Sequence, residues 1–444
     1  MLRVGFARLD ITPPLGNDLA GYYHRRIADG VLDPLYVNTL AVTDGNHTLI
    51  LIAVDFIGIQ QPYADRIRQE VAQRVGVGEE YVLVASIHQH TAPCLTDNPD
   101  WLTRLRDTEY INVTIRKLVD SAQMAMDDRC EATLSTALTQ TAQPISFVRR
   151  YFTDDGTVVT NPRSKYTIVK RCAESDNAVR LVRFHRQGAK DVALVNFSTH
   201  PDVVTGTKWS ADWPGFTRRF VEEDLQEVSC IFFTGAQGDA NHVDYFKPKE
   251  ERIKEGSGYA HSRYMGRTVA DAVVETWDKT QPMAETGIFA RHTVLYNLTN
   301  TEGIEYYDQA EAYEKEYSEN VKNGVWAPDY TPAHPYLQGV AHAARILSLR
   351  NAPIYRPIPL TVMGIGKVAL VGFGGEPFTS YSALLNDFAP DKFLLTVVCA
   401  NGCEGYFPTA EAFSQGGYEV ISSLFTPRLE AQILEAAQEM LKDF

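Results

Sequence analysis

The sequence predicts an α/β protein in which a mixed, mostly parallel sheet is layered between helices. Six short runs rich in Val, Ile and Leu recur along the 444 residues. Continuous apolar runs of this kind are typical of strands that are covered on both faces. Longer amphipathic stretches follow several of these runs, and alternating strands and helices indicate a layered α/β fold. We therefore expect one integrated domain over residues 1–444.

The expected strands and helices alternate along most of the chain. The strands are Thr48–Phe56, Tyr81–Ile87, Val192–Phe197, Cys230–Thr234, Lys367–Gly372 and Phe393–Cys399. The helices are Tyr63–Val75, Glu109–Met126, Trp213–Glu227, Tyr259–Thr276 and Ser380–Phe388.

Two segments interrupt this alternation. Residues 141–190 contain the turn pairs Asp155-Gly156 and Asn161-Pro162 between short alternating runs, which predicts a hairpin-rich insertion. Residues 300–355 are polar and rich in Tyr and Glu, and they predict a helical insertion with a helix at Gln309–Asn323. A loop follows that helix and contains Pro328, Pro332 and Pro335. The helical insertion is either a cap over a site or a solvated excursion.

The charge balance excludes some classes of partner. The chain has 42 Lys+Arg and 56 Asp+Glu, which gives a net charge of −14 and argues against binding to nucleic acid or an anionic membrane. The apolar runs are too short for a transmembrane segment, and the N-terminal residues show no signal peptide. We expect a cytoplasmic protein, and the composition does not fix its oligomeric state.

The six cysteines are scattered over the chain and do not resemble a disulfide framework. Cys399 and Cys403 form the one closely spaced pair. Two interpretations apply to this pair: a weak metal-binding signal, or two reduced thiols in the core.

Polar residues follow five of the expected strands, at the point where each strand ends. These segments are His88–Thr91, Ser198–Asp202, Gly235–Asp239, Gly374–Pro377 and Glu404–Tyr406. In open α/β sheets, residues at the carboxyl ends of the strands converge on one site. The pattern therefore predicts a functional site drawn from distant parts of the chain.

The residue types in these segments suit zinc. His88, His200 and Glu376 supply imidazole nitrogens and a carboxylate, and catalytic zinc commonly uses three such ligands. Each residue also has a purely structural interpretation. His88 and His90 can be a capped polar pair, His200 a turn histidine, and Glu376 a charge near a helix N-terminus. Tyr406 can be a half-buried ring with a hydrogen-bonded hydroxyl. The zinc hypothesis depends on these residues occurring together.

These motifs resemble the neutral (non-lysosomal) ceramidases, in the same order along the chain. The matching segments are Val4–Pro14 (VGFARLDITPP) with Gly21-Tyr22 after it, His88–Pro93 (HQHTAP), Asn196–Pro201 (NFSTHP), Gly374–Thr379 (GGEPFT) and Tyr406–Glu411 (YFPTAE), with Tyr418-Glu419 beyond them. The resemblance covers the catalytic domain of that family. It implies a single ceramidase-like catalytic domain, without the C-terminal β-sandwich domain.

The resemblance also implies a set of site residues and a reaction. It implies hydrolysis of an N-acyl amide bond, in a small-molecule or lipid-like substrate, by a metal-activated water. The implied zinc ligands are His88, His200, Glu376 and Tyr406. His90 would contact the substrate and shuttle protons. Arg149, or Arg150 in its place, would reach into the site. As a hypothesis, zinc together with Tyr406 or Arg149 would stabilise the oxyanion.

One departure from the family bears on the mechanism. Gly238–Val243 reads GDANHV, so Asn241 stands where the family has a serine, and serine chemistry is not expected. Asp202 and Asp55 either orient neighbouring groups or serve the structure alone. Three hypotheses stay open: a zinc-dependent amide hydrolase, a zinc-dependent hydrolase of an ester, lactone or phosphate, and a non-catalytic binding homologue. Ceramide itself is not specified by these motifs.

Overall fold

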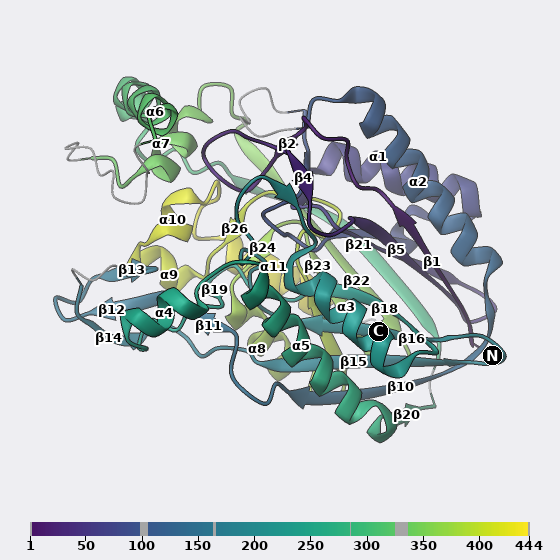
Figure 1. Ribbon diagram of the computed structural model, residues 1–444. Coiled ribbons are helices and arrows are strands. Elements are labelled where there is room, and N and C mark those ends of the chain that lie inside the picture. Colours follow the sequence, from purple (N-terminus) through teal and green to yellow (C-terminus); the bar gives the residue numbers. More distant parts are fainter. Residues whose placement is uncertain (1, 98–104, 163–165, 285, 325–335, 443–444) are drawn as a thin grey trace.

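Two β-sheets stack face to face between two layers of helices (Figure 1). The computed structural model describes residues 2–97, 105–162, 166–284, 286–324 and 336–442. The larger sheet has nine strands in the order β18-β16-β15-β10-β1-β5-β6-β8, with β20 beside β10. The smaller sheet has the order β21-β22-β23-β25. The expected α/β class is confirmed, although two sheets replace the single sheet that was expected.

The strands of the two sheets come from the whole length of the chain. Those of the larger sheet are β1 (Leu2–Asp10), β5 (Tyr36–Thr43), β6 (Thr48–Val54), β8 (Val82–Ser86), β10 (Cys130–Gln140), β15 (Ala178–Arg186), β16 (Asp191–Phe197), β18 (Val228–Thr234) and β20 (Gln281–Met283). Those of the smaller sheet are β21 (Ile288–Leu298), β22 (Tyr355–Ile365), β23 (Val368–Phe373) and β25 (Phe393–Val397).

The expectation of a mostly parallel arrangement is wrong, and the reason is specific. All six expected strands exist, and they pair with one another in parallel as β6–β8, β16–β18 and β23–β25. The other pairs in the two sheets are antiparallel. The sequence pattern therefore detected the three strand–helix–strand units and missed the antiparallel strands between them.

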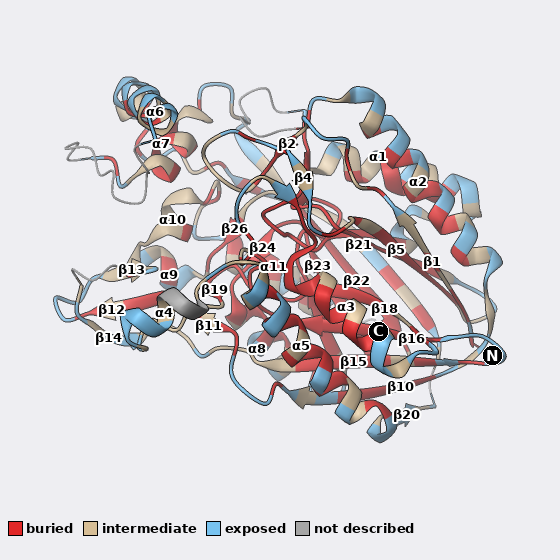
Figure 2. Cartoon of the chain, viewed as in Figure 1, coloured by how far each residue is buried: buried red, intermediate tan, exposed pale blue. Residues whose placement is uncertain are grey.

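The two sheets bury a common core, and helices cover their outer faces (Figure 2). In β6, Leu49, Leu51 and Ala53 face the smaller sheet, whereas Ile50 and Ile52 face the helices. This burial on both faces explains why the strand is apolar throughout. Helices α1 (Gln61–Val75), α2 (Thr108–Asp127), α3 (Asp212–Leu225) and α5 (Tyr259–Thr276) cover the larger sheet. Helices α8 (Thr379–Phe388) and α11 (Leu429–Lys442) cover the smaller sheet.

The segment that follows β25 connects the two edges of the larger sheet. Val398 N donates to the Thr234 oxygen at the end of β18, at 3.0 Å. Asn401 N donates to the Val84 oxygen of β8 at 2.7 Å, and Ser86 N donates to the Cys399 oxygen at 3.2 Å. These hydrogen bonds bring the carboxyl ends of the parallel pairs to one place.

Short strands and helices surround that place. The paired short strands are β2 (Asp18–Leu19) with β3 (Arg26–Ile27), β4 (Gly30–Val31) with β17 (Lys208–Trp209), β7 (Gly58–Ile59) with β9 (Cys94–Leu95), β11 (Phe147–Val148) with β19 (Ala240–Asn241), and β24 (Glu376–Pro377) with β26 (Tyr406–Phe407). The short helices are α4 (Lys249–Glu255), α9 (Ala410–Gln415) and α10 (Tyr418–Ser422), with the 3₁₀ turns Glu79–Tyr81, Trp277–Lys279 and Ile304–Tyr306.

Both expected insertions are present. The hairpin-rich segment forms a small sheet of β12 (Arg150–Thr153), β13 (Val158–Thr160) and β14 (Ile168–Arg171). The helical segment contains α6 (Tyr307–Lys322) and α7 (Val340–Leu347), which share a small core of their own. Pro328, Pro332 and Pro335 lie outside the described residues. Within the described part of the chain, none of the helices combines the length and the apolar character needed to cross a bilayer.

Candidate metal centre and active site

Four of the five polar strand-end segments contribute a side chain to one buried cluster. His88 and His90 follow β8, and His200 follows β16. Glu376 lies in β24, directly opposite Tyr406 in the parallel partner β26. The fifth segment, after β18, contributes a backbone carbonyl group. The exposed fractions of the side chains range from 1% for His200 to 9% for His90 and Tyr406.

The three histidine rings form a closed triangle. The ring centroids of His88 and His200 are 5.1 Å apart, those of His88 and His90 are 5.3 Å apart, and those of His90 and His200 are 5.5 Å apart. One ring nitrogen from each residue lies within 4.8 Å of the other two. This spacing is compatible with three ligands around a single ion.

Backbone carbonyl groups fix the tautomer of each ring. Nδ1 lies 2.8 Å from the Ile57 oxygen in His88, 3.1 Å from the Gly21 oxygen in His90, and 3.2 Å from the Gln237 oxygen in His200. Because a carbonyl oxygen only accepts, each Nδ1 carries a proton and each Nε2 is the nitrogen left to face the cluster. Metal-binding histidines are commonly held in this way by their other nitrogen.

Glu376 adds a negative charge to this group of acceptors. Its Oε2 lies 3.1 Å from His88 Nε2 and 3.3 Å from His200 Nε2. Among the described residues, Glu376 Oε2, His200 Nε2 and His90 Nε2 are buried atoms that have no hydrogen-bond partner. Positive charge stabilises such a group, and either a metal ion or a proton shared between Glu376 and His88 can supply it. The nitrogen and oxygen donors, their burial and their fixed tautomers fit a zinc ion.

His88 and Glu376 shift each other's pKa in opposite directions. Burial alone would lower the pKa of His88, but the Glu376 carboxylate outweighs it and holds that pKa well above its ordinary value. Burial likewise opposes ionisation of Glu376, and His88 reverses this so that the pKa of the carboxyl group falls well below its usual range. Glu376 therefore stays charged and attracts positive charge to the cluster.

Two backbone positions beside these rings have left-handed φ angles, at His88 and at Gly21. His88 has a φ of 70°, a left-handed conformation that is uncommon outside glycine and that turns the chain sharply after β8. The backbone of Gly21, at a φ of 106°, lies against the ring of His90. A Cβ added at Gly21 would lie 2.7 Å from His90 Nδ1. Gly21 therefore leaves the space that the ring of His90 occupies.

His90 has a second contact that the other two histidines lack. Its Nδ1 lies 3.7 Å from Asp202 Oδ1, and the same oxygen accepts a 2.6 Å hydrogen bond from the Tyr22 hydroxyl. Burial lowers the pKa of His90 to about 4, although the Asp202 carboxylate opposes that shift. Asp202 therefore sits where it can orient His90, rather than His200.

Arg149 is the arginine that reaches the cluster. It donates to the Tyr406 hydroxyl at 3.1 Å and to the Gly238 oxygen at 2.8 Å. Its Nε donates to Glu419 at 2.7 Å, and Glu419 is fully buried. Arg150 points elsewhere, to Gln415 at 3.1 Å.

Two other residues singled out from the sequence have structural partners away from the histidines. Asp55 forms a buried two-oxygen pair with Arg218, at 2.8 Å and 2.6 Å. Asn241 pairs with Phe147 of β11, and its side chain donates to the Asn161 side chain at 2.8 Å. Their contacts account for their burial without a role in the reaction.

The sequence reasoning missed two groups at the site. Glu419 was part of a quoted motif, but no role followed from it, because a glutamate in a helix gives no sign of a buried arginine partner. Tyr22 was in a similar position. Its neighbour Tyr23 has its hydroxyl 3.2 Å from the Tyr418 hydroxyl, and the rings of Tyr418 and Tyr406 are 5.7 Å apart.

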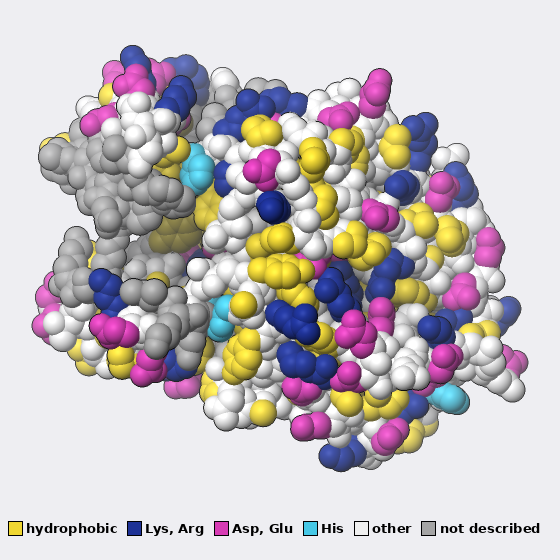
Figure 3. All heavy atoms as spheres, viewed as in Figure 1, with side chains coloured by type: hydrophobic (Ala, Val, Ile, Leu, Met, Phe, Trp, Pro, Cys, Tyr) yellow, Lys and Arg dark blue, Asp and Glu magenta, His cyan; other side chains and the backbone are white. Residues whose placement is uncertain are grey.

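This row of tyrosines runs from the cluster to the helical insertion. Tyr23 packs against the small core of α6 and α7. Figure 3 shows that the surface is hollowed between the α6–α7 pair and the β12–β14 sheet, and hydrophobic side chains lie in the hollow.

The fold and the cluster together define a layered α/β protein with a candidate metal centre at the carboxyl ends of its parallel strands. The crystal structure of neutral ceramidase from Pseudomonas aeruginosa is similar over 99% of this chain and 74% of that chain, with a TM-score of 0.71 and 15% identity. A ceramidase complexed with C2 is similar over 100% of this chain and 75% of that one, with a TM-score of 0.71 and 14% identity. The chain therefore has a neutral ceramidase-like fold, as the motifs implied.

No protein-family model matches the chain, and no curated protein is significantly similar to it in sequence.

Proposed function

We propose that this protein is a zinc-dependent hydrolase that cleaves an N-acyl amide bond. The observation that carries the proposal is the buried cluster of three imidazole groups and the Glu376 carboxylate. In this cluster His90 Nε2, His200 Nε2 and Glu376 Oε2 have no hydrogen-bond partner among the described residues. The ceramidase-like fold supports the reaction class, since both similar structures are ceramidases by name. The hydrophobic side chains in the hollow between the α6–α7 pair and the β12–β14 sheet (Figure 3) support a substrate with a lipid-like acyl group.

We assign the zinc ligands as His88, His200, Glu376 and Tyr406. Glu376 contacts His88 and His200, and strand pairing sets Tyr406 beside it. When bound, zinc supplies a Lewis acid that polarises a carbonyl group and lowers the pKa of a water molecule to about 7. The protein's contribution is to hold the ligands rigidly and to keep the site dry.

His90 is the proton carrier in this proposal. Its Nε2 lone pair faces the cluster, and its Nδ1 proton is anchored on the Gly21 oxygen. It can therefore take a proton from the attacking water and give it to the leaving amine. Asp202, 3.7 Å from Nδ1, stabilises the imidazolium that forms between these two transfers.

Arg149 and Tyr406 stabilise the oxyanion. Because the Tyr406 hydroxyl accepts a hydrogen bond from Arg149, its own proton is free to point elsewhere in the site. Preorganised donors of this kind contribute about 3 kcal/mol each to the transition state. The positive charge of Arg149 makes the Tyr406 hydroxyl a stronger hydrogen-bond donor, and Glu419 holds the guanidinium group of Arg149 in place.

An amide fits this site better than a phosphate ester does. A phosphate dianion needs cationic side chains that are available to it. Among the described residues around the cluster, Arg149 is already paired with Glu419, and the Arg26 guanidinium donates to the Ala20 and His90 oxygens. Esters share the carbonyl chemistry of amides and belong in the same substrate panel.

The test combines metal content with hydrolysis. We expect one zinc ion per purified chain and release of the amine from N-acyl amides with long acyl chains. His200→Ala should lose both zinc and hydrolysis while circular dichroism stays unchanged. His90→Ala should keep zinc and lose turnover. The matched control is His185→Ala, because His185 is 65% exposed and pairs with Asp191 away from the cluster. Full zinc occupancy in His200→Ala would refute the ligand assignment.

A further inference from the structure

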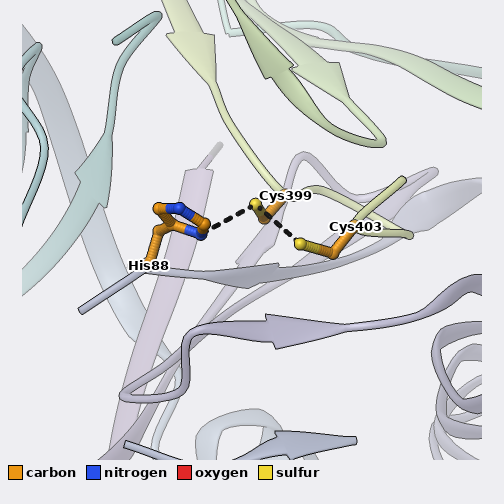
Figure 4. A group of neighbouring side chains, drawn as sticks. All are labelled: His88, Cys399 and Cys403. Carbon is orange, nitrogen blue, oxygen red and sulfur yellow. Dashed lines mark hydrogen bonds between the residues drawn. The ribbon is translucent and has the colours of Figure 1, made fainter. Parts of the chain in front are cut away.

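Three cysteines gather directly behind His88. The sulfur atoms of Cys399 and Cys403 are 3.2 Å apart, and Cys399 Sγ lies 3.5 Å from His88 Nδ1 (Figure 4). Cys94 lies nearby, since a Cβ added at Gly58 would touch both Cys403 Sγ, at 2.6 Å, and Cys94 Sγ, at 3.8 Å. The hydrolysis proposed above uses none of these thiols.

The loop that carries the pair is held in one conformation. Cys399 and Asn401 have φ values of 47° and 56°, so the chain makes two left-handed steps within three residues. The Asn401 side chain accepts from Val84 N at 2.9 Å and donates to Thr361 Oγ1 at 2.9 Å. These bonds clamp the loop to β8 and β22 and so fix the backbone that carries the two cysteines.

The room for Cys403 comes from a missing side chain in β7. Gly58 is the residue that faces the Cys403 sulfur, and any larger residue there would collide with it. Cys403 is half-buried, whereas Cys399 is only 1% exposed. Cys403 is therefore the more exposed residue of the pair and the one that a small oxidant would meet first, and the Cys399 sulfur lies 3.2 Å from its sulfur.

We propose that Cys403 and Cys399 form a peroxide-oxidisable dithiol, with Cys403 as the thiol that reacts first and Cys399 as the resolving thiol. Redox-sensing cysteines are typically accessible and lie next to such a partner. The sulfur atoms need only move from 3.2 Å to the disulfide bond length of about 2.05 Å. The clamped loop favours this closure, because the pair is already aligned.

The chemistry balances with a hydroperoxide as the oxidant. The Cys403 thiol attacks the peroxide O–O bond, gains one oxygen atom as a sulfenic acid, and releases water from hydrogen peroxide. The Cys399 thiol then attacks that sulfur, forms the S–S bond and releases a second water. The two thiols lose two electrons and two protons in total, and the peroxide takes them up. A thiol reductant reverses the reaction.

The test uses the full-length protein, reduced and then freed of reductant. Hydrogen peroxide is added, remaining thiols are alkylated, and the digested peptides are mapped by mass spectrometry. We expect a Cys399–Cys403 crosslink that is lighter by two hydrogen atoms and disappears after dithiothreitol. Cys130 is the internal control: it is also half-buried, but its sulfur contacts the Val4 oxygen at 4.0 Å. It should form no crosslink.

Two variants separate the roles of the pair. In Cys399→Ser, Cys403 should stop at the sulfenic acid and be labelled by dimedone. In Cys403→Ser, Cys399 should stay reduced, because it is shielded from solvent. A crosslink between Cys94 and either partner, or a wild-type protein in which Cys403 passes to the sulfinic acid without a crosslink, would overturn the proposal. Neither measurement depends on zinc or on hydrolysis.

Discussion

Replacing Glu419 with glutamine tests how the structure holds Arg149. The Glu419 carboxylate is fully buried, accepts 2.7 Å hydrogen bonds from Arg149 Nε and Thr160 Oγ1, and lies 3.7 Å from Arg150 NH1. Glutamine keeps the volume and removes the charge. Two buried guanidinium groups, with exposed fractions of 7% and 1%, then lose the anion that lies between them.

The size of the effect follows from these contacts. A hydrogen bond to a charged group contributes about 1.5–3 kcal/mol, so the two short bonds together correspond to about 3–6 kcal/mol. Removing one partner of a buried ion pair destabilises a protein by about 3–5 kcal/mol. We therefore expect Glu419→Gln to lower the free energy of unfolding by about 4 kcal/mol.

Urea unfolding, followed by circular dichroism, measures this loss. Glu70→Gln is the matched control, because Glu70 forms a 2.8 Å pair with Arg66 in which the side chains are 37% and 45% exposed. Such a surface pair contributes about 0–1 kcal/mol. Arg149→Met combined with Glu419→Gln should destabilise less than the sum of the single changes. A Glu419→Gln loss no larger than that of Glu70→Gln, or full additivity in the double variant, would refute the reasoning.

Three further predictions concern other parts of the molecule. Gly21→Ala places a Cβ 2.7 Å from His90 Nδ1, so kcat should fall while zinc content stays unchanged; unchanged kcat would show that the ring tolerates the displacement. Burial, with Arg68 nearby, lowers the pKa of His292 to about 4. The unfolded chain, with a histidine pKa of about 6.5, binds that proton first, so stability should fall as pH drops from about 6.5 to 4. His292→Gln should make this fall shallower in urea titrations, and parallel curves would contradict it. Chelation should lower the melting temperature, by the equivalent of about 2.7 kcal/mol if zinc was present at 100 times its Kd, and His200→Ala should not respond.

The sequence revealed the parallel strands because both of their faces are buried. The antiparallel strands gave weaker patterns for identifiable reasons. In β15, Arg180, Arg183 and Arg186 interrupt the apolar run. Arg183 pairs with Asp191 of the next strand, and Arg186 pairs with Asp128, which is 58 residues away. In β22, Pro357 and Pro359 argue against a central strand, yet both are accommodated opposite the edge strand β21. These segments form strands because they pair with residues far away in the sequence, and a short stretch of sequence carries no information about that pairing.

The convergence of residues at the carboxyl ends of the strands also explains how much of the site could be predicted from the sequence. His88, His200, Glu376 and Tyr406 each follow a strand that was visible, so their meeting could be expected. The hydrogen-bond partners of these side chains could not be predicted. The carbonyl groups of Ile57, Gly21 and Gln237, which set the histidine tautomers, belong to backbone that any sequence has. Only the folded chain shows which carbonyl lies beside which ring.

The three strand–helix–strand units have a consequence for the order in which the molecule assembles. Each unit is local in sequence and can form early, whereas the contacts between units are long-range and slow to form. His88 comes from the first unit, His200 from the second, and Glu376 from the third. A nascent chain that has completed the first two units therefore still lacks Glu376, the carboxylate of the cluster. The site comes into existence only when the last unit docks, so metal capture should report the completion of folding rather than its onset.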